Sequence, residues 1–195
     1  MIYFTSDLHF QHENVIKYCN RPFANADEMG KALIANWNSV VKPEDTVYVL
    51  GDFSLAQSAV PTFTPILNGT KYLVPGNHDF CHSYHKKSRN PEARANWVKK
   101  YTDWGWIVLP EQTTLEIEGV TTVNMCHHPY ELKEPGDDKY LNWRPKDDGR
   151  WLLCGHVHHN WKFGERVINV GTDVWDFKPV SIEVIKEHIC KFSII

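Results

Sequence analysis

The sequence predicts a mixed α/β (α+β) fold in which two packed, mixed β-sheets are flanked by helices. Short runs rich in β-branched and aromatic residues end at Gly, Pro or Asp, as strands do, and they alternate with helical segments. The second half of the chain is richer in such runs, with a hairpin turn at 116–120 between strands near 113–117 and 120–126. With 195 residues, 42% of them hydrophobic, we expect one domain over residues 1–195 whose sheet core is covered on both faces.

Four helical segments accompany these strands. Apolar residues recur at helical spacing over residues 26–41, and a proline ends that helix. A helix interrupted by proline is predicted near 58–68. A basic helix is predicted over 91–101, because proline suits the first turn. Ser181 is a typical N-cap for a short last helix.

The composition of the chain excludes several classes of protein. The net charge of −3 gives no global basic field that would recruit nucleic acid. No apolar stretch approaches the length of a membrane span, and the first strand begins at residue 2, which leaves no room for a signal peptide. The five cysteines are scattered and form no CxxC pair, so we expect free thiols and a cytoplasmic protein.

Five polar clusters each follow a strand-like run directly. In chain order they are Asp7-Leu8-His9, Gly51-Asp52, Gly76-Asn77-His78-Asp79, His127-His128-Pro129 and Gly155-His156-Val157-His158. In open α/β sheets, ligands bind outside the carboxyl ends of the strands. We therefore expect the side chains of all five clusters to meet at one edge of the fold.

The donor atoms of these clusters suit divalent transition metals. Imidazole nitrogens are combined with carboxylate and amide oxygens and with no thiolate, which favours Mn, Fe, Ni or Zn. Seven candidate ligands are too many for one tetrahedral site, but they fit two ions that share a carboxylate. They are Asp7, His9, Asp52, Asn77, His127, His156 and His158. Two-metal sites activate water and clamp both oxygens of an in-line displacement, and phosphate esters are their usual substrates.

These five clusters, in this order over residues 3–173, resemble the motifs of the calcineurin-like metallophosphoesterases, and their flanks resemble the small bacterial and phage branch. The resemblance implies a four-layer αββα sandwich and two divalent ions, with Mn preferred and Fe, Ni or Zn as alternatives. It assigns one ion to Asp7, His9, Asp52 and His158, and the other to Asp52, Asn77, His127 and His156. It also implies hydrolysis of phosphomonoesters or phosphodiesters through in-line attack by a hydroxide that bridges the ions.

Four histidine and arginine residues near the ligands are candidates for contact with the substrate. His78 is not a ligand in the family pattern, and an imidazole there can stabilise phosphoryl oxygens or protonate the leaving oxygen. His78 is therefore the predicted catalytic residue, with a structural histidine as the alternative. The family pattern His-x-Pro selects His127 as the ligand, so His128 is expected to line the pocket. His12 is a candidate phosphate contact or a solvated surface residue, and Arg144 is a candidate phosphate clamp.

Two segments between the clusters are expected to set specificity. Residues 80–104 carry an excess of Lys and Arg within 86–100, which either binds an anionic substrate or forms a solvated helix face. Residues 130–150 form a polar stretch that should border the cleft. Asp79 is expected to fix loop geometry, and Asp173 is a candidate partner for a ligating histidine.

Two alternatives to a general phosphoesterase follow from the same residues. The basic segment supports a nuclease or a cyclic-nucleotide phosphodiesterase, and nucleic acid or a nucleotide would then be the partner. A metal-binding scaffold module on the same fold would be expected to lack the central histidine or some ligands, whereas this chain has all of them. The sequence leaves open the natural ester, the choice between monoester and diester, the metal in vivo and the oligomeric state.

Overall fold

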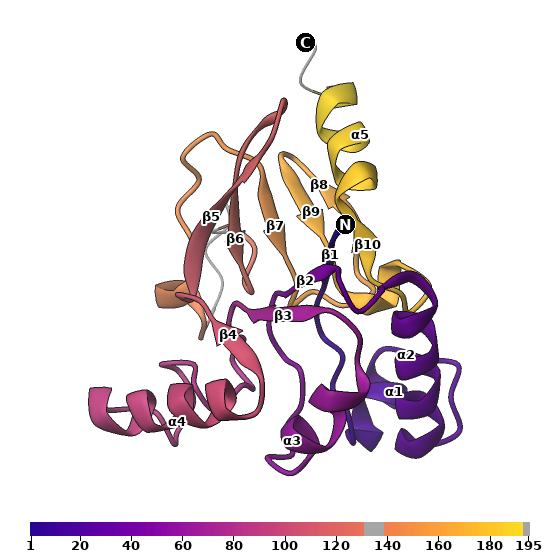
Figure 1. The fold of residues 1–195 in the computed structure, drawn as a ribbon. Helices are drawn as coiled ribbons and strands as arrows, with labels where there is room; N and C mark the ends of the chain where they lie inside the picture. The colour runs from indigo at the N-terminus through magenta and orange to yellow at the C-terminus, as the bar shows by residue number, and fades with distance from the viewer. Residues whose placement is uncertain (131–138, 193–195) are drawn as a thin grey trace.

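Two five-stranded sheets frame the structure, a computed structural model that describes residues 1–130 and 139–192 (Figure 1). The first sheet has the order β10-β1-β2-β3-β4, with bounds Val180–Ser181, Ile2–Thr5, Thr46–Val49, Thr70–Leu73 and Trp106–Val108. The second has the order β5-β6-β7-β9-β8, with bounds Gln112–Ile117, Thr121–Cys126, Leu152–Cys154, Val167–Asn169 and Phe163–Gly164. In each sheet parallel strands are joined by antiparallel ones, so the two mixed sheets predicted from the sequence are confirmed.

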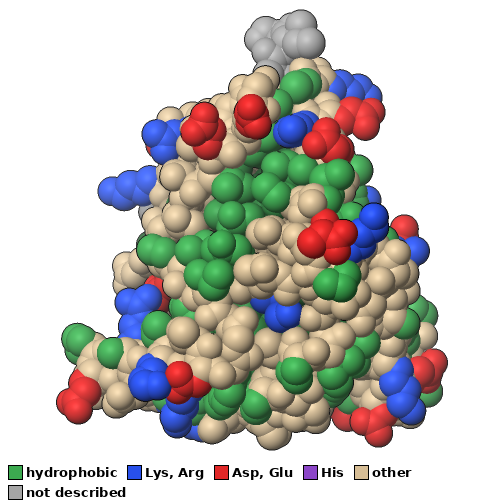
Figure 2. All heavy atoms as spheres, in the orientation of Figure 1, with side chains coloured by type: hydrophobic (Ala, Val, Ile, Leu, Met, Phe, Trp, Pro, Cys, Tyr) green, Lys and Arg blue, Asp and Glu red, His purple; other side chains and the backbone are tan. Residues whose placement is uncertain are grey.

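One hydrophobic core lies between the two sheets. Leu50 and Val74, at the ends of β2 and β3, pack with Val123 and other inward-facing residues of the second sheet. The last helix, α5 (Ile182–Phe192), adds Ile185 to this core. On the face drawn in Figure 2, hydrophobic side chains gather between the β5–β6 hairpin and α5, where the core between the sheets is only partly covered.

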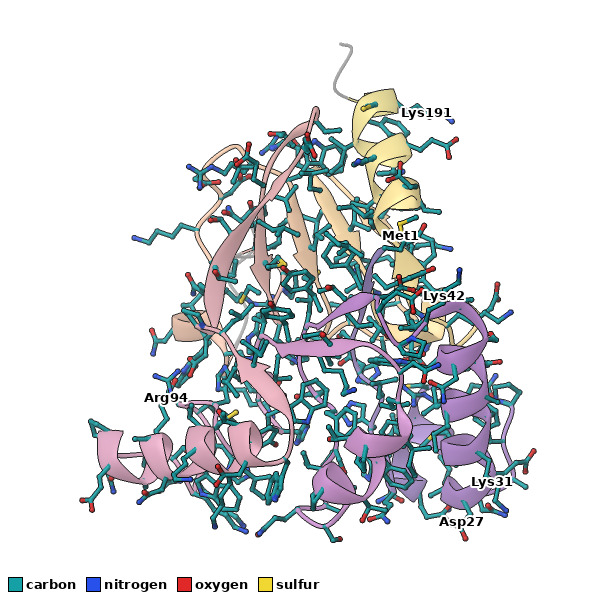
Figure 3. All side chains as sticks on the ribbon, viewed as in Figure 1. Met1, Asp27, Lys31, Lys42, Arg94 and Lys191 are labelled. Carbon is teal, nitrogen blue, oxygen red and sulfur yellow. The ribbon has the colours of Figure 1, made fainter. Side chains whose placement is uncertain are left out.

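Four helices cover the outer face of the first sheet (Figure 1). They are α1 (Glu13–Tyr18), α2 (Ala26–Val40), α3 (Ala59–Phe63) and α4 (Pro91–Asp103). In α2, Met29, Leu33 and Trp37 share one face and are buried against the sheet. The opposite face is solvated, and Figure 3 shows Asp27 and Lys31 pointing away from the protein.

The helices expected from the sequence are confirmed. Those predicted over 26–41 and 91–101 correspond to α2 and α4. The proline-interrupted helix near 58–68 is α3 followed by a 3-10 turn at Thr64–Ile66. The last helix begins directly after Ser181.

The layer outside the second sheet is thinner than the helical layer outside the first. Cys126, Leu152 and Cys154 point outward there and pack with Tyr130, because strand residues alternate between the two faces. The 3-10 turn Leu141–Trp143 lies against them, with the Trp143 carbonyl 3.6 Å from the Cys126 sulfur. The four-layer sandwich is thus confirmed, with unequal outer layers.

The parallel register brings the ends of several strands together. Thr5 pairs with Val49 and Val49 with Leu73, so β1, β2 and β3 end side by side. β6 and β7 run parallel in the second sheet and end near the same place. A bridge between Ser6 and Gly171 joins the end of β1 to the second sheet. The five polar clusters therefore share one edge of the sandwich.

Two remaining expectations concern the polar stretch at 130–150 and the absence of a membrane span. The polar stretch at 130–150 includes residues 131–138, which lie outside the described residues. In the part of the chain that is described, the structure contains no helix with the length and apolar character needed to cross a membrane.

Candidate metal centre

The loops after the strands hold several predicted ligands in an unusual backbone conformation. Asp7, His9, Asp52, His156 and His158 all have positive φ, between 50° and 71°. Such a conformation costs about 1–3 kcal/mol for a residue with a side chain and persists where surrounding structure enforces it. Here backbone hydrogen bonds enforce it, from the Asp7 amide to the Gly51 carbonyl at 3.0 Å and from the His9 amide to the Asp52 carbonyl at 3.1 Å. The turns therefore aim these side chains at one place.

Glycines in the motifs allow these turns to approach each other. Gly51 has a φ of 88°, and a Cβ at this position would lie 2.5 Å from the Gly76 Cα. A Cβ on Gly76 would in turn lie 2.7 Å from the Asp52 amide nitrogen. Because real Cβ atoms do not come so close, both positions require glycine. Gly155 has the same role at the end of β7, where a Cβ would overlap the Ser6 hydroxyl and the Asp7 carboxylate.

Asp7, His9 and His158 form one half of the site. The Nε2 atoms of His9 and His158 each lie 3.9 Å from Asp7 Oδ1, and the two imidazole rings stack with centroids 5.1 Å apart. Asp7 Oδ2 accepts hydrogen bonds from the Ser6 hydroxyl and from the His156 amide, the latter at 3.0 Å. Asp7 Oδ1 is left facing the two imidazoles.

His127 and His156 form the other half together with Asp52. His127 Nε2 lies 3.4 Å from Asp52 Oδ2 and 3.3 Å from His156 Nδ1. His127 Nδ1 is 2.8 Å from the Leu50 carbonyl oxygen, to which it donates its proton. This hydrogen bond directs Nε2 into the site, as is usual for a ligating histidine. Asn77 is buried in the same loop as Gly76.

Asp52 lies between the two halves. Its Oδ2 is 3.7 Å from His9 Nε2 and 3.4 Å from His127 Nε2, one imidazole from each half. Its Oδ1 accepts the His78 amide at 2.9 Å. The carboxylate is thus oriented by the loop after β3 and reaches both sets of donors.

The donor atoms fit divalent ions. The ligating atoms of Asp7, His9 and His158 lie within 4.8 Å of one another, as do those of Asp7, Asp52 and His127. Asp7 Oδ1, both ring nitrogens of His9 and Asn77 Oδ1 are buried without a hydrogen-bond partner among the described residues. Buried polar atoms are rarely left unpaired unless an ion or water completes them. The set is rich in nitrogen and oxygen and suits transition metals.

In the metal-free protein, protonated histidines supply the positive charge that balances the carboxylates of the site. Burial alone would lower the pKa of His127, but Asp52 outweighs it and raises that pKa to about 9. Burial likewise opposes protonation of His158, yet Asp7 and Asp173 raise its pKa to about 11. For His9 burial dominates and holds the pKa well below its usual value. Metal binding at such a site displaces protons from the ligands.

A buried arginine, which the sequence did not suggest, stabilises the Asp7 half. The Arg21 guanidinium contacts both carboxylate oxygens of Asp173, at 2.7 and 2.8 Å, and donates to the Asp7 carbonyl at 2.6 Å. Asp173 Oδ2 in turn lies 3.2 Å from His158 Nδ1. Asp173 therefore contacts His158, one of the predicted ligands, as the sequence suggested. No motif pointed to Arg21, because a single arginine after a short helix is indistinguishable from a surface residue in sequence.

Asp79 organises the loops rather than facing the donors. Its carboxylate is fully buried and accepts the amides of Asp52 and Gly76, each at 2.8 Å, and that of Phe53 at 3.2 Å. Burial and the nearby Asp52 raise the pKa of Asp79 to about 7. These contacts agree with the expected role in loop geometry.

His78 and His12 border the site from its open side. The His78 side chain is 43% exposed, with Nε2 4.0 Å from Asp52 Oδ2. His12 precedes α1, and its ring centroid lies 5.7 Å from that of His9. Both residues line a hollow of about 400 Å³ that also includes His9 and His158. A second hollow of about 350 Å³ lies on the other side of His78 and includes Lys86 and Lys87.

The two other candidate substrate contacts are buried. His128 is fully buried beside His127 and His156. Arg144 is 8% exposed and donates to the Pro129 carbonyl at 3.1 Å, which ties it to the loop after β6. In the basic segment 86–100, Lys86 and Lys87 border the second hollow near His78, Arg94 contacts Glu111 at 2.7 Å, and Lys99 and Lys100 on α4 are exposed.

Comparison with known proteins identifies the class of protein that this fold and site define. A family model described as calcineurin-like phosphoesterase matches residues 1–169, so the chain belongs to that family. The family implies a divalent metal centre and phosphate-ester substrates.

Relatives come from archaea, bacteria and phages. The chain is 34% identical to an uncharacterised protein of Methanocaldococcus jannaschii, over 100% of this chain and 94% of that protein. It is 31% identical to the gene 66 protein of Mycobacterium phage D29, over 92% of each. A crystal structure of a protein of unknown function from Aquifex aeolicus is similar with a TM-score of 0.71 and 28% identity, over 97% of this chain and 99% of that one.

Proposed function

We propose that this protein is a two-metal phosphoesterase that hydrolyses phosphomonoesters or phosphodiesters. The observation that carries the proposal is the position of Asp52. Its Oδ2 lies within 4 Å of an imidazole nitrogen from each half of the site, as a carboxylate shared by two ions must. A structural carboxylate would instead be expected to use both oxygens for hydrogen bonds within the protein.

In this proposal Asp7, His9, Asp52 and His158 hold one ion, and Asp52, Asn77, His127 and His156 hold the other. Mn is the preferred metal, with Fe, Ni or Zn as alternatives, because the donors are imidazole, carboxylate and amide groups. When bound, two divalent ions supply positive charge for the phosphoryl oxygens and an activated water for in-line attack. The protein contributes the turns that fix the ligands and a histidine-lined opening above them.

His78 is the proposed catalytic residue. Its backbone amide is fixed by Asp52, while its half-exposed ring projects beside His9 and borders both hollows. From this position the ring can donate a hydrogen bond to a phosphoryl oxygen or a proton to the leaving oxygen. His12, in the first hollow, is a further proposed contact for the phosphate ester. Arg144 is proposed to act on the substrate only through the Pro129 loop that it holds.

The proposal is tested with the purified full-length protein. We expect no hydrolysis of p-nitrophenyl phosphate or bis-p-nitrophenyl phosphate after treatment with EDTA, and recovery of activity with Mn²⁺. The variant Asp52→Asn should lose activity by about a hundred- to a thousandfold, which is the scale expected when electrostatic stabilisation of the transition state is lost. Asp27→Asn, on the solvated face of α2, is the matched control and should match wild type (Figure 3). Full activity in EDTA would contradict the proposal, and a folded protein without activity on any ester would favour a metal-binding scaffold.

A second candidate is a nuclease or cyclic-nucleotide phosphodiesterase. It is favoured by the hollow beside His78, where Lys86 and Lys87 can face an anion next to the scissile phosphate. For this function we expect affinity for DNA, RNA or nucleotides that falls steeply with salt, and Lys86→Ala should weaken it. A protein that hydrolyses only simple esters, at a rate that does not depend on salt, would exclude the nuclease or cyclic-nucleotide function.

A further inference from the structure

His128 lies at the end of β6, directly after the proposed ligand His127, and its side chain is completely buried. Its ring is surrounded by other rings rather than by hydrogen-bond partners. Centroid distances are 4.6 Å to His156 and 5.0 Å to both His127 and Tyr140. The position would suit an apolar aromatic residue, so an imidazole here calls for an explanation.

Both ring nitrogens of His128 are buried and have no hydrogen-bond partner among the described residues. The same condition marks three proposed ligands, through Asp7 Oδ1, both nitrogens of His9 and Asn77 Oδ1. The other buried polar atoms without a partner are the hydroxyls of Thr5 and Thr172 and Nε of Arg166. None of these three atoms is a usual donor to a metal. Leaving a buried polar atom unpaired costs about 1–3 kcal/mol. His128 therefore shares the condition of residues that an ion would complete.

A neighbouring histidine shows what a structural role would require. His82 is 1% exposed, and its Nδ1 accepts the Tyr84 amide at 3.0 Å. Its Nε2 lies 3.6 Å from a carboxylate oxygen of Glu111. Nδ1 of His82 is thus hydrogen-bonded and Nε2 lies near a carboxylate, whereas neither nitrogen of His128 has a hydrogen-bond partner among the described residues.

We propose that His128 is a further ligand of the ion held by Asp52, Asn77, His127 and His156, which gives that ion three imidazoles. The donor nitrogens of His127, His128 and His156 lie within 4.8 Å of one another. Because metal–imidazole bonds are about 2.0–2.1 Å long, two nitrogens on one ion are at most about 4.2 Å apart, so a small ring rotation completes the site. The inference rests on the proposed function, because it adds a ligand to one of its two ions.

A third imidazole makes the two positions chemically unequal. The ion held by Asp7, His9, Asp52 and His158 has two carboxylates and two imidazoles. The ion beside His128 has one carboxylate, one amide and three imidazoles. Imidazole favours Zn, Ni, Cu and Fe, whereas carboxylates suit Mn and Mg. The position beside His128 should therefore favour Zn or Ni relative to Mn more strongly than the other position does, while Mn still binds at both.

The test compares wild type with His128→Phe, which keeps an aromatic ring in the pocket. His188→Phe is the matched control, because His188 lies on α5 and stacks on Phe163 away from the site. Chelator-treated proteins are titrated with Zn²⁺, Ni²⁺ and Mn²⁺, and bound metal per chain is measured together with the visible spectrum of the Co²⁺ form. We expect two ions in wild type and control. In His128→Phe one of the two should bind Zn²⁺ and Ni²⁺ at least about tenfold more weakly, with weaker or shifted Co²⁺ bands.

Unchanged affinity for both ions and an unchanged Co²⁺ spectrum in folded His128→Phe would overturn the inference. Binding of fewer than two ions by wild type would instead overturn the two-metal proposal, so the two failures are distinguishable. If His128→Phe does not fold, proton NMR of the Co²⁺-loaded wild type decides the question. Five strongly shifted exchangeable imidazole protons support ligation by His128, and four contradict it.

Discussion

The two halves of the metal centre are stabilised by different means. The half with Asp7, His9 and His158 is held by a charged network, in which buried Arg21 binds Asp173 and the Asp7 carbonyl, and Asp173 contacts His158. The half with His127 and His156 is held mainly by contacts to backbone carbonyls, from His127 Nδ1 to Leu50 at 2.8 Å and from buried Arg144 to Pro129 at 3.1 Å. Its imidazoles face Asp52, each other and the unpaired nitrogens of His128.

This difference indicates that His158, in the first half, is held in position before metal binds by residues outside the ligand set. A buried ion pair fixes side-chain positions through directional hydrogen bonds, which orient a ligand and raise its affinity for metal. Both halves also bury ring nitrogens that have no partner among the described residues, those of His9 in the first half and those of His128 in the second, and each carries a cost that a bound ion or a water offsets. The first half should therefore depend on residues outside the ligand set, and the second mainly on the ligands themselves.

The largest effects should come from removing one imidazole from each half. His158→Ala should remove the ion near Asp7, and His156→Ala the ion near Asn77. Each loss should exceed the roughly 10–100-fold in affinity that residues orienting a ligand contribute. Metal analysis of the two purified variants measures this. Two variants that each lose the same ion, or both ions, would show that the halves are not independent.

The next largest effect should come from Arg21→Met in the first half. Breaking a buried ion pair leaves Asp173 uncompensated and costs about 3–5 kcal/mol of unfolding free energy. The remaining folded protein should bind the first ion about 10–100-fold more weakly and the second with unchanged affinity. Urea unfolding and metal titration measure both effects.

The control for Arg21→Met is Arg166→Met. Arg166 contacts Asp147 at 2.6 Å, but both side chains are at least a third exposed. An exposed pair contributes about 0–1 kcal/mol, so this variant should be nearly as stable as wild type. Equal destabilisation by both variants would mean that the Arg21 network has no special role.

The gathering of the candidate ligands could be predicted because each of their motifs follows a strand. Strand-like runs place residues 7, 52 and 127 at strand ends, and the parallel register then brings those ends together. The family resemblance also assigned His156 and His158, which follow Gly155, to different ions. The structure shows why residue 155 is a glycine, since a side chain there would collide with Ser6 and Asp7.

The network behind the ligands could not be predicted in the same way. Arg21 and Asp173 are 152 residues apart and belong to no shared motif, so only the folded chain brings them together. The burial of His128 could not be predicted either, because the sequence suggested only that it lines the pocket and could not show that both nitrogens lack partners among the described residues. Long-range polar contacts depend on packing that local patterns do not encode.

A smaller effect should appear in the pH dependence of the metal-free protein. Burial would raise the pKa of Asp173, but hydrogen bonds from His158 and Arg21 outweigh it and hold that pKa at about 2. The folded pKa is below the unfolded one, so the carboxylate stabilises the fold above about pH 4 and this contribution is lost as pH falls toward 2. The shift corresponds to about 2 kcal/mol at pH 7 and roughly half of that near pH 3.

Unfolding of wild type and Asp173→Asn by urea, followed across this pH range, measures the contribution. The difference in stability between the two proteins should shrink as the pH is lowered. A difference that stays constant from pH 7 to pH 3 would show that the charge on Asp173 does not stabilise the first half.

The smallest effect should come from the hollow over the first half. His12 lines it with His9 and His158, and its ring contributes no proposed ligand. His12→Ala should raise KM for bis-p-nitrophenyl phosphate about 2–10-fold, the value of one hydrogen bond, and leave metal content unchanged. Lys86→Ala makes the matching change in the hollow across His78, so the larger KM effect identifies the hollow that the ester occupies. Loss of metal from His12→Ala would instead show that His12 helps to hold the first ion, and His12 would then count as a ligand and not as a substrate contact.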